Sequence, residues 1–271
     1  IFFIKKIFFA LGRFRRAGII NGAILEQILD NSQKVQHNGI SMFFSVPNEL
    51  NYFRVNTFSS KEPETLDWID TLKPGTVLWD IGANIGLYSV YAAKRGLEVV
   101  SFEPSVFNLE LLARNINLNH LEKEITIFSY PISEKNGLNT MKFSSKQMGG
   151  ALSSFGETFG WDGKEFENNF SYQTLGFKLD DINSKFNLKI PNNIKIDVDG
   201  IEHLILKGGI KTLSNIDSIL IEVNDNFLDQ AKNCQNILEK SGFKLITKLN
   251  SQLFKNSNEG YDKVYNQIWK R

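Results

Sequence analysis

The chain has 271 residues, 42% of them hydrophobic, so it is long enough to bury a full core. Its 31 basic residues nearly balance its 30 acidic residues, and the formal net charge is +1. Because nucleic-acid-binding proteins usually show a basic excess, we expect no nucleic-acid partner. The single cysteine, Cys234, excludes an intrachain disulfide framework and fits a reducing, cytoplasmic compartment. No apolar run reaches 18 residues, so no membrane-spanning helix is predicted.

The first 16 residues carry an amphipathic pattern. Apolar residues at positions 3, 4, 7, 8, 11 and 14 share one helical face, and the basic residues lie mostly off that face: Lys5, Lys6, Arg13 and Arg16. One interpretation is a helix that makes weak contact with a membrane surface, which would give a membrane-associated location. The other is a helix that packs on the body of its own protein.

A hairpin is predicted next, with strands over 40–46 and 51–55 separated by Pro47. Residues 1–58 would thus form an N-terminal extension of a helix and a hairpin, followed by the main domain over 59–271. In that domain strands alternate with helices, and the expected strands are 76–81, 98–102, 125–130, 194–198, 218–223, 243–247 and 265–269. This alternation predicts an α/β fold with a doubly wound, Rossmann-like, mostly parallel sheet.

The segment 134–193 is too long for a bare loop between two strands of such a sheet. Its β-prone flanks at 139–144 and 171–178 predict an inserted β-hairpin with a glycine-rich tip. We expect it to lie over the carboxyl ends of the strands, where open α/β sheets bind ligands. The insertion is therefore a candidate lid and substrate-recognition element.

The most informative motif is the turn Asp80-Ile81-Gly82-Ala83-Asn84-Ile85-Gly86, which joins the first of these strands to a helix that starts at Leu87. Glycine at 82 and 86 lets the backbone approach a ligand and lets the helix pack closely on the strand. Asp80 ends the strand, where its carboxylate can accept a hydrogen bond from an ammonium group or from the amides of the turn. Asn84 stands where a dinucleotide loop needs glycine beside the pyrophosphate. The turn therefore favours a smaller, phosphate-free ligand.

Glu103 follows the next strand, 21 residues after Gly82, and precedes Pro104. An acid at this place binds ribose hydroxyls in nucleotide-binding α/β folds. Together, the turn and Glu103 predict an adenosine-type ligand.

Acids also follow the strand 194–198, which lies beside the first strand across the switch point. Asp197 and Asp199 fall on the same side of that strand, and Glu202 falls in the first turn of the next helix. They could act as a general base, bind a cofactor ammonium group or cap the helix. Glu222, near the end of the strand 218–223, is a further candidate for this cleft. No Cys and His spacing indicates zinc, and no metal site is predicted, although metal assistance through the same carboxylates stays open.

Taken in this order, the motifs resemble those of the FkbM-type methyltransferases, which are class I enzymes dependent on S-adenosylmethionine. The resemblance covers about residues 50–250. The motifs that carry it are Phe58 with Lys61-Glu62-Pro63, Asp80 to Ser89, Phe102-Glu103-Pro104 with Asn108, 115–119, 179–181, Lys195 to Glu202 and 221–223. The chain departs from the family at Asp199, where Glu is more usual, and at Ile132-Ser133, where a small residue usually precedes Ser or Gly.

The resemblance implies a seven-stranded sheet of order 3-2-1-4-5-7-6 with an antiparallel last strand. It also implies methyl transfer to a hydroxyl of a sugar, surface glycan or natural product. The implied cofactor-binding residues are Asp80, Gly82, Ala83, Asn84, Gly86 and Leu87 for the methionine part, Glu103, Pro104 and Asn108 on the ribose side, and Ile132 and Ser133 beside the adenine. Asp197 and Asp199 would face the methyl group and the acceptor, and one of them would be the base; Glu202 is the third catalytic candidate.

Two other functions stay open. An NAD-dependent oxidoreductase would need glycine near 84 and a hydride-site motif that the stretch 91–95 lacks. A non-catalytic nucleoside-binding module would leave the acids at 197–202 without a role, and buried carboxylates are costly.

Overall fold

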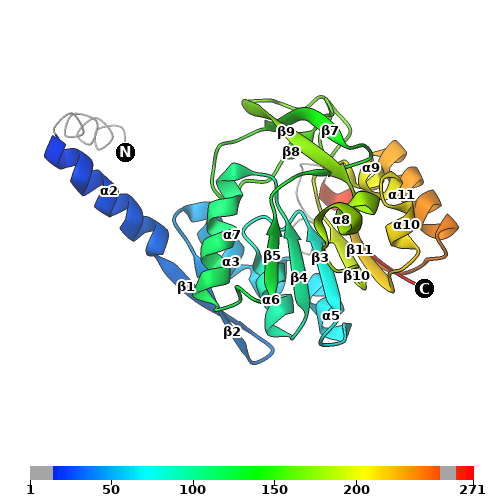
Figure 1. Cartoon of the computed structure of the whole chain (residues 1–271), viewed down its shortest axis with the longest axis horizontal. Helices are drawn as coiled ribbons and strands as arrows, with labels where there is room; N and C mark the ends of the chain where they lie inside the picture. The colour runs from blue at the N-terminus through cyan, green and yellow to red at the C-terminus, as the bar shows by residue number, and fades with distance from the viewer. Residues whose placement is uncertain (1–14, 251–260) are drawn as a thin grey trace.

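The computed structural model describes residues 15–250 and 261–271. A seven-stranded sheet lies at its centre, with the order β12-β13-β11-β10-β3-β4-β5 (Figure 1). The strands are β3 (Val77–Ile81), β4 (Glu98–Phe102), β5 (Ile125–Phe128), β10 (Asn193–Ile196), β11 (Ser218–Asn224), β12 (Lys244–Leu249) and β13 (Val264–Lys270). Numbered along the chain, this order is 3-2-1-4-5-7-6, and β13 runs antiparallel to both of its neighbours. The predicted sheet is confirmed.

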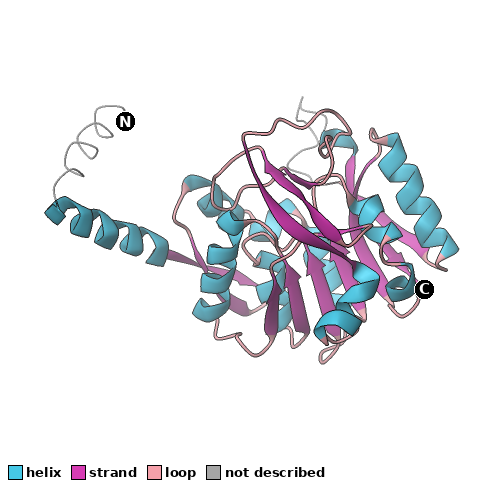
Figure 2. Ribbon diagram, turned by 45° about the horizontal axis from the view of Figure 1, so that its top comes forward, coloured by secondary structure: helices cyan, strands magenta, loops and turns pink. Residues whose placement is uncertain are grey.

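Helices cover both faces of the sheet (Figure 2). Val77, Trp79 and Ile81 alternate onto one face, and the apolar sides of four helices complete the core there. These are α8 (Leu179–Phe186), α9 (Glu202–Lys207), α10 (Ile210–Leu213) and α11 (Leu228–Lys240). Leu78 points to the opposite face, which packs against α5 (Pro63–Thr71), α6 (Leu87–Lys94) and α7 (Val106–Leu118).

The segment between β5 and β10 builds a second, four-stranded sheet. Its strands are β6 (Ile132–Ser133), β7 (Gly137–Phe143), β8 (Ser153–Phe155) and β9 (Phe170–Lys178), in the order β6-β9-β7-β8. β7 and β9 pair antiparallel, with Met141 opposite Tyr172. Met141, Phe143 and Phe155 join the core cluster that contains Ile81, so this sheet rests on the carboxyl ends of the central strands (Figure 1).

The predicted N-terminal hairpin was wrong in its second strand. The hairpin pairs β1 (Ser32–His37) with β2 (Ile40–Ser45), and residues expected to form a strand at 51–55 belong to helix α3 (Glu49–Asn56). Asn38 and Gly39, with φ of 45° and 80°, form the hairpin turn. Asn48 begins α3, since its side chain accepts a hydrogen bond from Asn51 N at 2.9 Å. A short helix, α4 (Phe58–Lys61), leads from α3 to α5.

Two asparagines hold the hairpin against the main domain: Asn115 within α7 and Asn119 directly after it. Asn115 Oδ1 accepts a hydrogen bond from Ser45 N at 2.7 Å, and Asn119 bonds both the N–H and the carbonyl of Phe43. This attachment places α3, which directly follows the hairpin, beside the glycine-rich turn.

Helix α2 (Arg15–Asp30) extends away from the rest of the molecule in both views (Figures 1 and 2). Its large apolar side chains are mostly exposed: Ile19, Ile20, Ile24, Leu25 and Ile28. Positions 3 to 14 of the predicted N-terminal pattern lie outside the described residues. Within 15–250 and 261–271, no helix is both long and apolar enough to cross a bilayer.

Candidate active site

The turn after β3 has a backbone that only glycine allows at position 82. Gly82 has φ of 88°, and a Cβ atom there would lie 1.8 Å from the carbonyl oxygen of Asp197 at the end of β10. Gly86 has φ of 84° at the start of α6, where a Cβ would lie 2.5 Å from Leu112 of α7. Asn84 also has positive φ, at 52°. Gly82 therefore lets the ends of β3 and β10 meet, whereas Gly86 serves helix packing.

Glu103 connects this turn with the next strand. Its Oε2 accepts a hydrogen bond from Asn84 N at 2.7 Å, and its Oε1 accepts one from Ser105 N at 2.8 Å. Burial raises the pKa of Glu103 to about 7, even though both backbone bonds favour the ionised form. Since each carboxylate oxygen can accept a second hydrogen bond, Glu103 retains acceptor capacity for a ligand.

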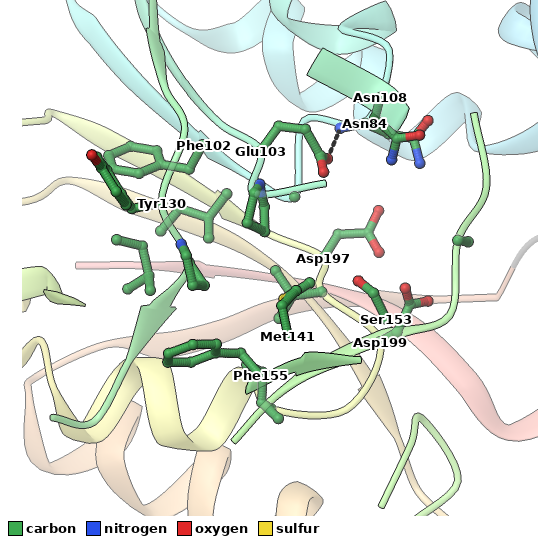
Figure 3. A pocket seen from close by; sticks show the side chains of 18 of the residues that line it. Asn84, Phe102, Glu103, Asn108, Tyr130, Met141, Ser153, Phe155, Asp197 and Asp199 are labelled. Carbon is green, nitrogen blue, oxygen red and sulfur yellow. Dashed lines mark hydrogen bonds between the residues drawn. The ribbon is translucent and has the colours of Figure 1, made fainter. Parts of the chain in front are cut away.

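A cavity of about 560 Å³, counted with its open mouth, lies between this turn and the second sheet (Figure 3). Six of the predicted cofactor-binding residues line it together with apolar side chains: Gly82, Asn84, Glu103, Pro104, Asn108 and Ile132. The apolar part of the lining consists mainly of Phe102, Tyr130, Met141 and Phe155. An apolar slot with one carboxylate at its side fits a planar base joined to a ribose.

A second cavity, of about 1850 Å³ with its open mouth, lies on the other side of the turn. Its walls come from α3, from α4 with the residue after it, Glu62, and from the ends of β10 and β11. Ala83 and Leu87, two of the predicted cofactor-binding residues, line this cavity. The residues that line both cavities are Gly82, Asn84, Gly150, Ala151, Asp197 and Asp199. The two cavities therefore meet at the turn and at the predicted acids.

The loop 147–152 separates the two cavities; we call it the strap. Met148 O accepts hydrogen bonds from Asn48 Nδ2 and Asn51 Nδ2, each at 3.0 Å. Gly149 O accepts one from Arg54 Nε at 2.9 Å, and Gly149 N donates to Asn108 Oδ1 at 2.9 Å. Gly150 O accepts from Asn84 Nδ2 at 2.9 Å. The N-terminal extension, α7 and the glycine-rich turn thus all hold the strap.

Asp199 lies beneath the strap in a strained conformation, with φ of 61°. Its Oδ2 accepts a hydrogen bond from Leu152 N at 2.8 Å. Burial, together with the negative charge of Asp197, raises the pKa of Asp199 to about 6.

A buried lysine holds Asp197. The Nζ of Lys195 lies 3.0 Å from Asp197 Oδ2 and 3.7 Å from Asp80 Oδ1, and the residue is 1% exposed. Although burial disfavours a charged lysine, Asp197, Asp80 and Glu62 together hold the pKa of Lys195 above its usual value. Burial raises the pKa of Asp80 despite the nearby lysine. Lys195 therefore stays charged and holds Asp197 in place at the meeting point of the cavities.

A second ion pair, between Lys61 and Glu62, forms part of the wall of the second cavity. Glu62 Oε1 accepts a hydrogen bond from Lys61 Nζ at 2.6 Å, and Glu62 Oε2 accepts one from Tyr88 OH at 2.9 Å. Glu62 is buried, yet Lys61 and Lys195 lower its pKa to about 2. Sequence reasoning did not assign roles to Lys61, Glu62, Tyr88 or Lys195. Two signals were available: all four residues belong to the motifs that carry the family resemblance, and alternation places Lys195 on the same side of its strand as Asp197.

Four of the predicted site residues lie outside both cavity linings: Asp80, Gly86, Ser133 and Glu202. Asp80 is buried below the turn, where its Oδ2 accepts a hydrogen bond from Ser89 Oγ at 2.6 Å. Glu202 is also buried, and it accepts hydrogen bonds from Val198 N at 3.0 Å and Gly200 N at 3.1 Å and one from Gln230 Nε2. Glu202 thus holds the loop that carries Asp199. Among the described residues, no group of three or more His, Cys, Asp and Glu side chains is arranged to hold a metal ion.

Comparison with known families matches the part of the chain that contains this site. A family model described as the methyltransferase FkbM domain matches residues 80–255. The matched range begins at Asp80 and includes the turn, Glu103, the second sheet, the strap and the acids after β10.

The curated relatives fall into two groups. Hexuronic acid methyltransferase AglP of Haloferax volcanii is 21% identical over 187 residues, which are 69% of this chain and 72% of that protein. A tRNA (guanine(37)-N(1))-methyltransferase of Leishmania major is 31% identical over 111 residues, 41% of this chain and 15% of that protein. A tRNA (uracil(54)-C(5))-methyltransferase of Pyrococcus furiosus is 24% identical over 90 residues, 33% of this chain and 21% of that protein. The chain thus spans about a fifth or less of the length of these tRNA-modifying relatives.

A solved structure from Streptococcus mutans, described as that of an S-adenosylmethionine-dependent methyltransferase, has a similar fold. Its TM-score is 0.53 and its identity 12%, and the alignment covers 89% of this chain and 55% of that one. The likeness supports the Rossmann-like arrangement of the sheet. The family model matches more than half of the chain. The chain therefore belongs to the FkbM methyltransferase family, and its cofactor is S-adenosylmethionine.

Proposed function

We propose that this protein transfers a methyl group from S-adenosylmethionine to a hydroxyl oxygen of a sugar, surface glycan or natural product. The observation that carries the proposal is the meeting of the apolar cavity beside Glu103 and a larger open cavity at Gly82, Asn84, Asp197 and Asp199. When bound, the cofactor supplies a methyl group activated by a positively charged sulfur. Such a transfer depends above all on holding the two partners in line, which two cavities with a common opening can do.

The roles of the residues follow from their places. Glu103 binds the ribose in the first cavity, and Ile132 lies beside the adenine. Asn84 and Leu87 hold the methionine part on the side of the second cavity. Asp197 and Asp199, at the common opening, face the methyl group and the acceptor.

A sugar acceptor has the better support of the two classes that the relatives suggest. The match to the hexuronic acid methyltransferase covers more than two thirds of both chains. The matches to the tRNA methyltransferases cover smaller parts of this chain, and its 31 basic residues are offset by 30 acidic ones. The absence of a nucleic-acid partner stays a prediction.

Calorimetry with S-adenosylhomocysteine and with NAD tests the cofactor assignment. We expect S-adenosylhomocysteine to bind and NAD to give no heat, because the Asn84 side chain occupies the place where a pyrophosphate would need open backbone. Glu103→Ala should weaken S-adenosylhomocysteine at least tenfold, since ribose hydroxyls would lose a charged hydrogen-bond partner. Glu98→Ala, at the opposite end of the same strand, is the matched control. Tight NAD binding without S-adenosylhomocysteine heat would contradict the proposal.

We further propose that helix α2 binds the surface of anionic membranes. Ile20, Ile24 and Ile28 recur every four residues, so they share one exposed face. The first 25 residues contain five basic residues and no acid, which complements the charge of an anionic lipid surface: Lys5, Lys6, Arg13, Arg15 and Arg16.

Co-sedimentation with phosphatidylcholine vesicles, with and without phosphatidylglycerol, measures this binding. We expect binding that requires phosphatidylglycerol and weakens with salt. Ile24→Asp/Ile28→Asp should reduce it at least tenfold, because each buried isoleucine contributes on the order of 1.5–3 kcal/mol. Leu228→Asp, an exposed apolar residue on α11, is the control. If the Ile24→Asp/Ile28→Asp variant loses self-association instead of vesicle binding, α2 pairs with a second copy.

A further inference from the structure

Most acids around the second cavity already have a protein partner. Asp197 pairs with Lys195, Asp199 accepts a hydrogen bond from Leu152 N, and Glu62 bonds both Lys61 and Tyr88. The carboxylate of each of these residues is therefore oriented by the protein itself. None of them has both of its oxygens free to meet an incoming hydroxyl group.

Glu222 differs from these acids. It lies near the end of β11 and lines the second cavity, and within the described part of the chain its carboxyl has no hydrogen bond or ion pair. Its neighbour Ile221 pairs with Ile196 of β10, so Glu222 lies beside Asp197 at the carboxyl ends of these two strands. A carboxyl that lines a cavity and has no protein partner is placed to meet a ligand there.

We propose that Glu222 is the base that takes the proton of the acceptor hydroxyl, while Asp197 and Asp199 only orient the partners. This inference rests on the proposed methyl transfer. The hydroxyl oxygen bonds to the methyl carbon as its proton passes to a Glu222 carboxylate oxygen. The carbon–sulfur bond breaks and its electron pair stays on sulfur, so sulfur loses one positive charge and Glu222 becomes neutral. Atoms and charge therefore balance without a further reactant.

The surroundings of Glu222 link its protonation to the charge in the site. Burial raises the pKa of Glu222 well above its usual value; Asp197, Glu62 and Asp199 raise it further, and Lys61 lowers it. The facing residue of β13, Asn266, carries no charge. The raised pKa favours the protonated carboxyl in the empty site, and a cation bound at the common opening favours its ionisation.

The test compares proton release on binding S-adenosylmethionine, which carries a sulfonium charge, with that on binding neutral S-adenosylhomocysteine. Calorimetry at pH 7 in two buffers of different ionisation enthalpy gives the number of protons. We expect the sulfonium ligand to release more protons, up to about one per site, since one carboxyl changes its state. Glu222→Gln should abolish the difference in proton release between the two ligands. It should leave the affinity for S-adenosylhomocysteine within about threefold, because Glu222 lies outside the first cavity.

Glu64→Gln is the matched control, since Glu64 is a buried acid with a raised pKa that lies outside both cavities and already bonds Asn266 Nδ2. The Glu64→Gln variant should keep the wild-type difference in proton release between the two ligands. An unchanged difference in Glu222→Gln, or its loss in Asp199→Asn instead, overturns the inference and leaves the proposed function standing. If the wild type binds neither ligand, the proposed function fails as well.

Activity provides a second measurement, with p-nitrophenyl β-glucoside and p-nitrophenyl β-glucuronide as acceptors and a labelled methyl group. Glu222→Gln should lower kcat on the order of 100-fold or more, the usual contribution of a general base, while KM for S-adenosylmethionine stays the same. A loss of kcat below about threefold overturns the assignment. If neither sugar is methylated, the proton count decides.

Discussion

Gly82→Ala is expected to abolish cofactor binding and to lower the free energy of unfolding on the order of 3–5 kcal/mol. The added Cβ would lie 1.8 Å from the carbonyl oxygen of Asp197, so β3 and β10 would have to separate at the point where the cavities meet. A left-handed conformation with φ of 88° adds about 1–2 kcal/mol for any residue with a Cβ. Calorimetry with S-adenosylhomocysteine and urea unfolding measure the two effects.

Gly75→Ala separates the clash from the backbone strain. Gly75 has φ of 79°, but a Cβ there would meet no atom within 4 Å. We expect this variant to lose only the conformational part, about 1–2 kcal/mol, and to bind S-adenosylhomocysteine normally. Equal losses of stability and binding in both variants would show that the close approach of β10 to the turn does not matter.

Lys195→Met is expected to lower the free energy of unfolding by about 3–5 kcal/mol at pH 7, because it leaves the buried carboxylate of Asp80 and the partly buried one of Asp197 without their charged partner. Asp197 Oδ2 lies 3.0 Å from the lysine Nζ, and Asp80 is 1% exposed. Methionine fills most of the lysine volume, so the loss measures charge rather than packing. Urea unfolding of the variant and the wild type gives the difference.

The pH dependence of the Lys195→Met variant provides its own check. Burial already raises the pKa of Asp80, and removal of the lysine raises it further. A carboxyl with a raised folded-state pKa binds protons more tightly when folded, so the variant should regain stability as the pH falls from 7 towards 5. Lys189→Met is the control, since Lys189 pairs with Glu98 at the surface and should change stability by less than about 1 kcal/mol at any pH. If the stability lost in Lys195→Met stays the same as the pH falls, the argument from charge is refuted.

The central sheet was predictable from the sequence because its strands and helices alternate and recognisable turn residues separate them. The buried run at Val77–Ile81 and the turn after it specify the first strand, and the resemblance supplied the order of the others. The N-terminal hairpin was mispredicted for a local reason. Tyr52, Phe53 and Val55 are β-prone, and they outweighed the weaker signals of the Asn38-Gly39 turn and the Asn48 cap.

The candidate site was only partly predictable. Gly82, Asn84, Glu103, Asp197 and Asp199 come together as their positions at strand ends require, because the carboxyl ends of parallel strands share one edge. The hydrogen bond from Tyr88 to Glu62 and the ion pair of Lys195 with Asp80 depend on tertiary packing between segments that are far apart in the chain. Periodicity and spacing carry no information about such contacts.

The strap also bears on how the protein folds. Its hydrogen bonds to α3 join residues separated by up to 100 positions in the chain, so they can form only after a long loop has closed. We therefore expect the contacts that build the wall between the two cavities to form late in folding, after the local strand–helix units. A ligand that needs this wall binds the finished state alone, and by mass action it stabilises the last step of folding. In the cell, the supply of cofactor would then help to set how much of the chain reaches its native state.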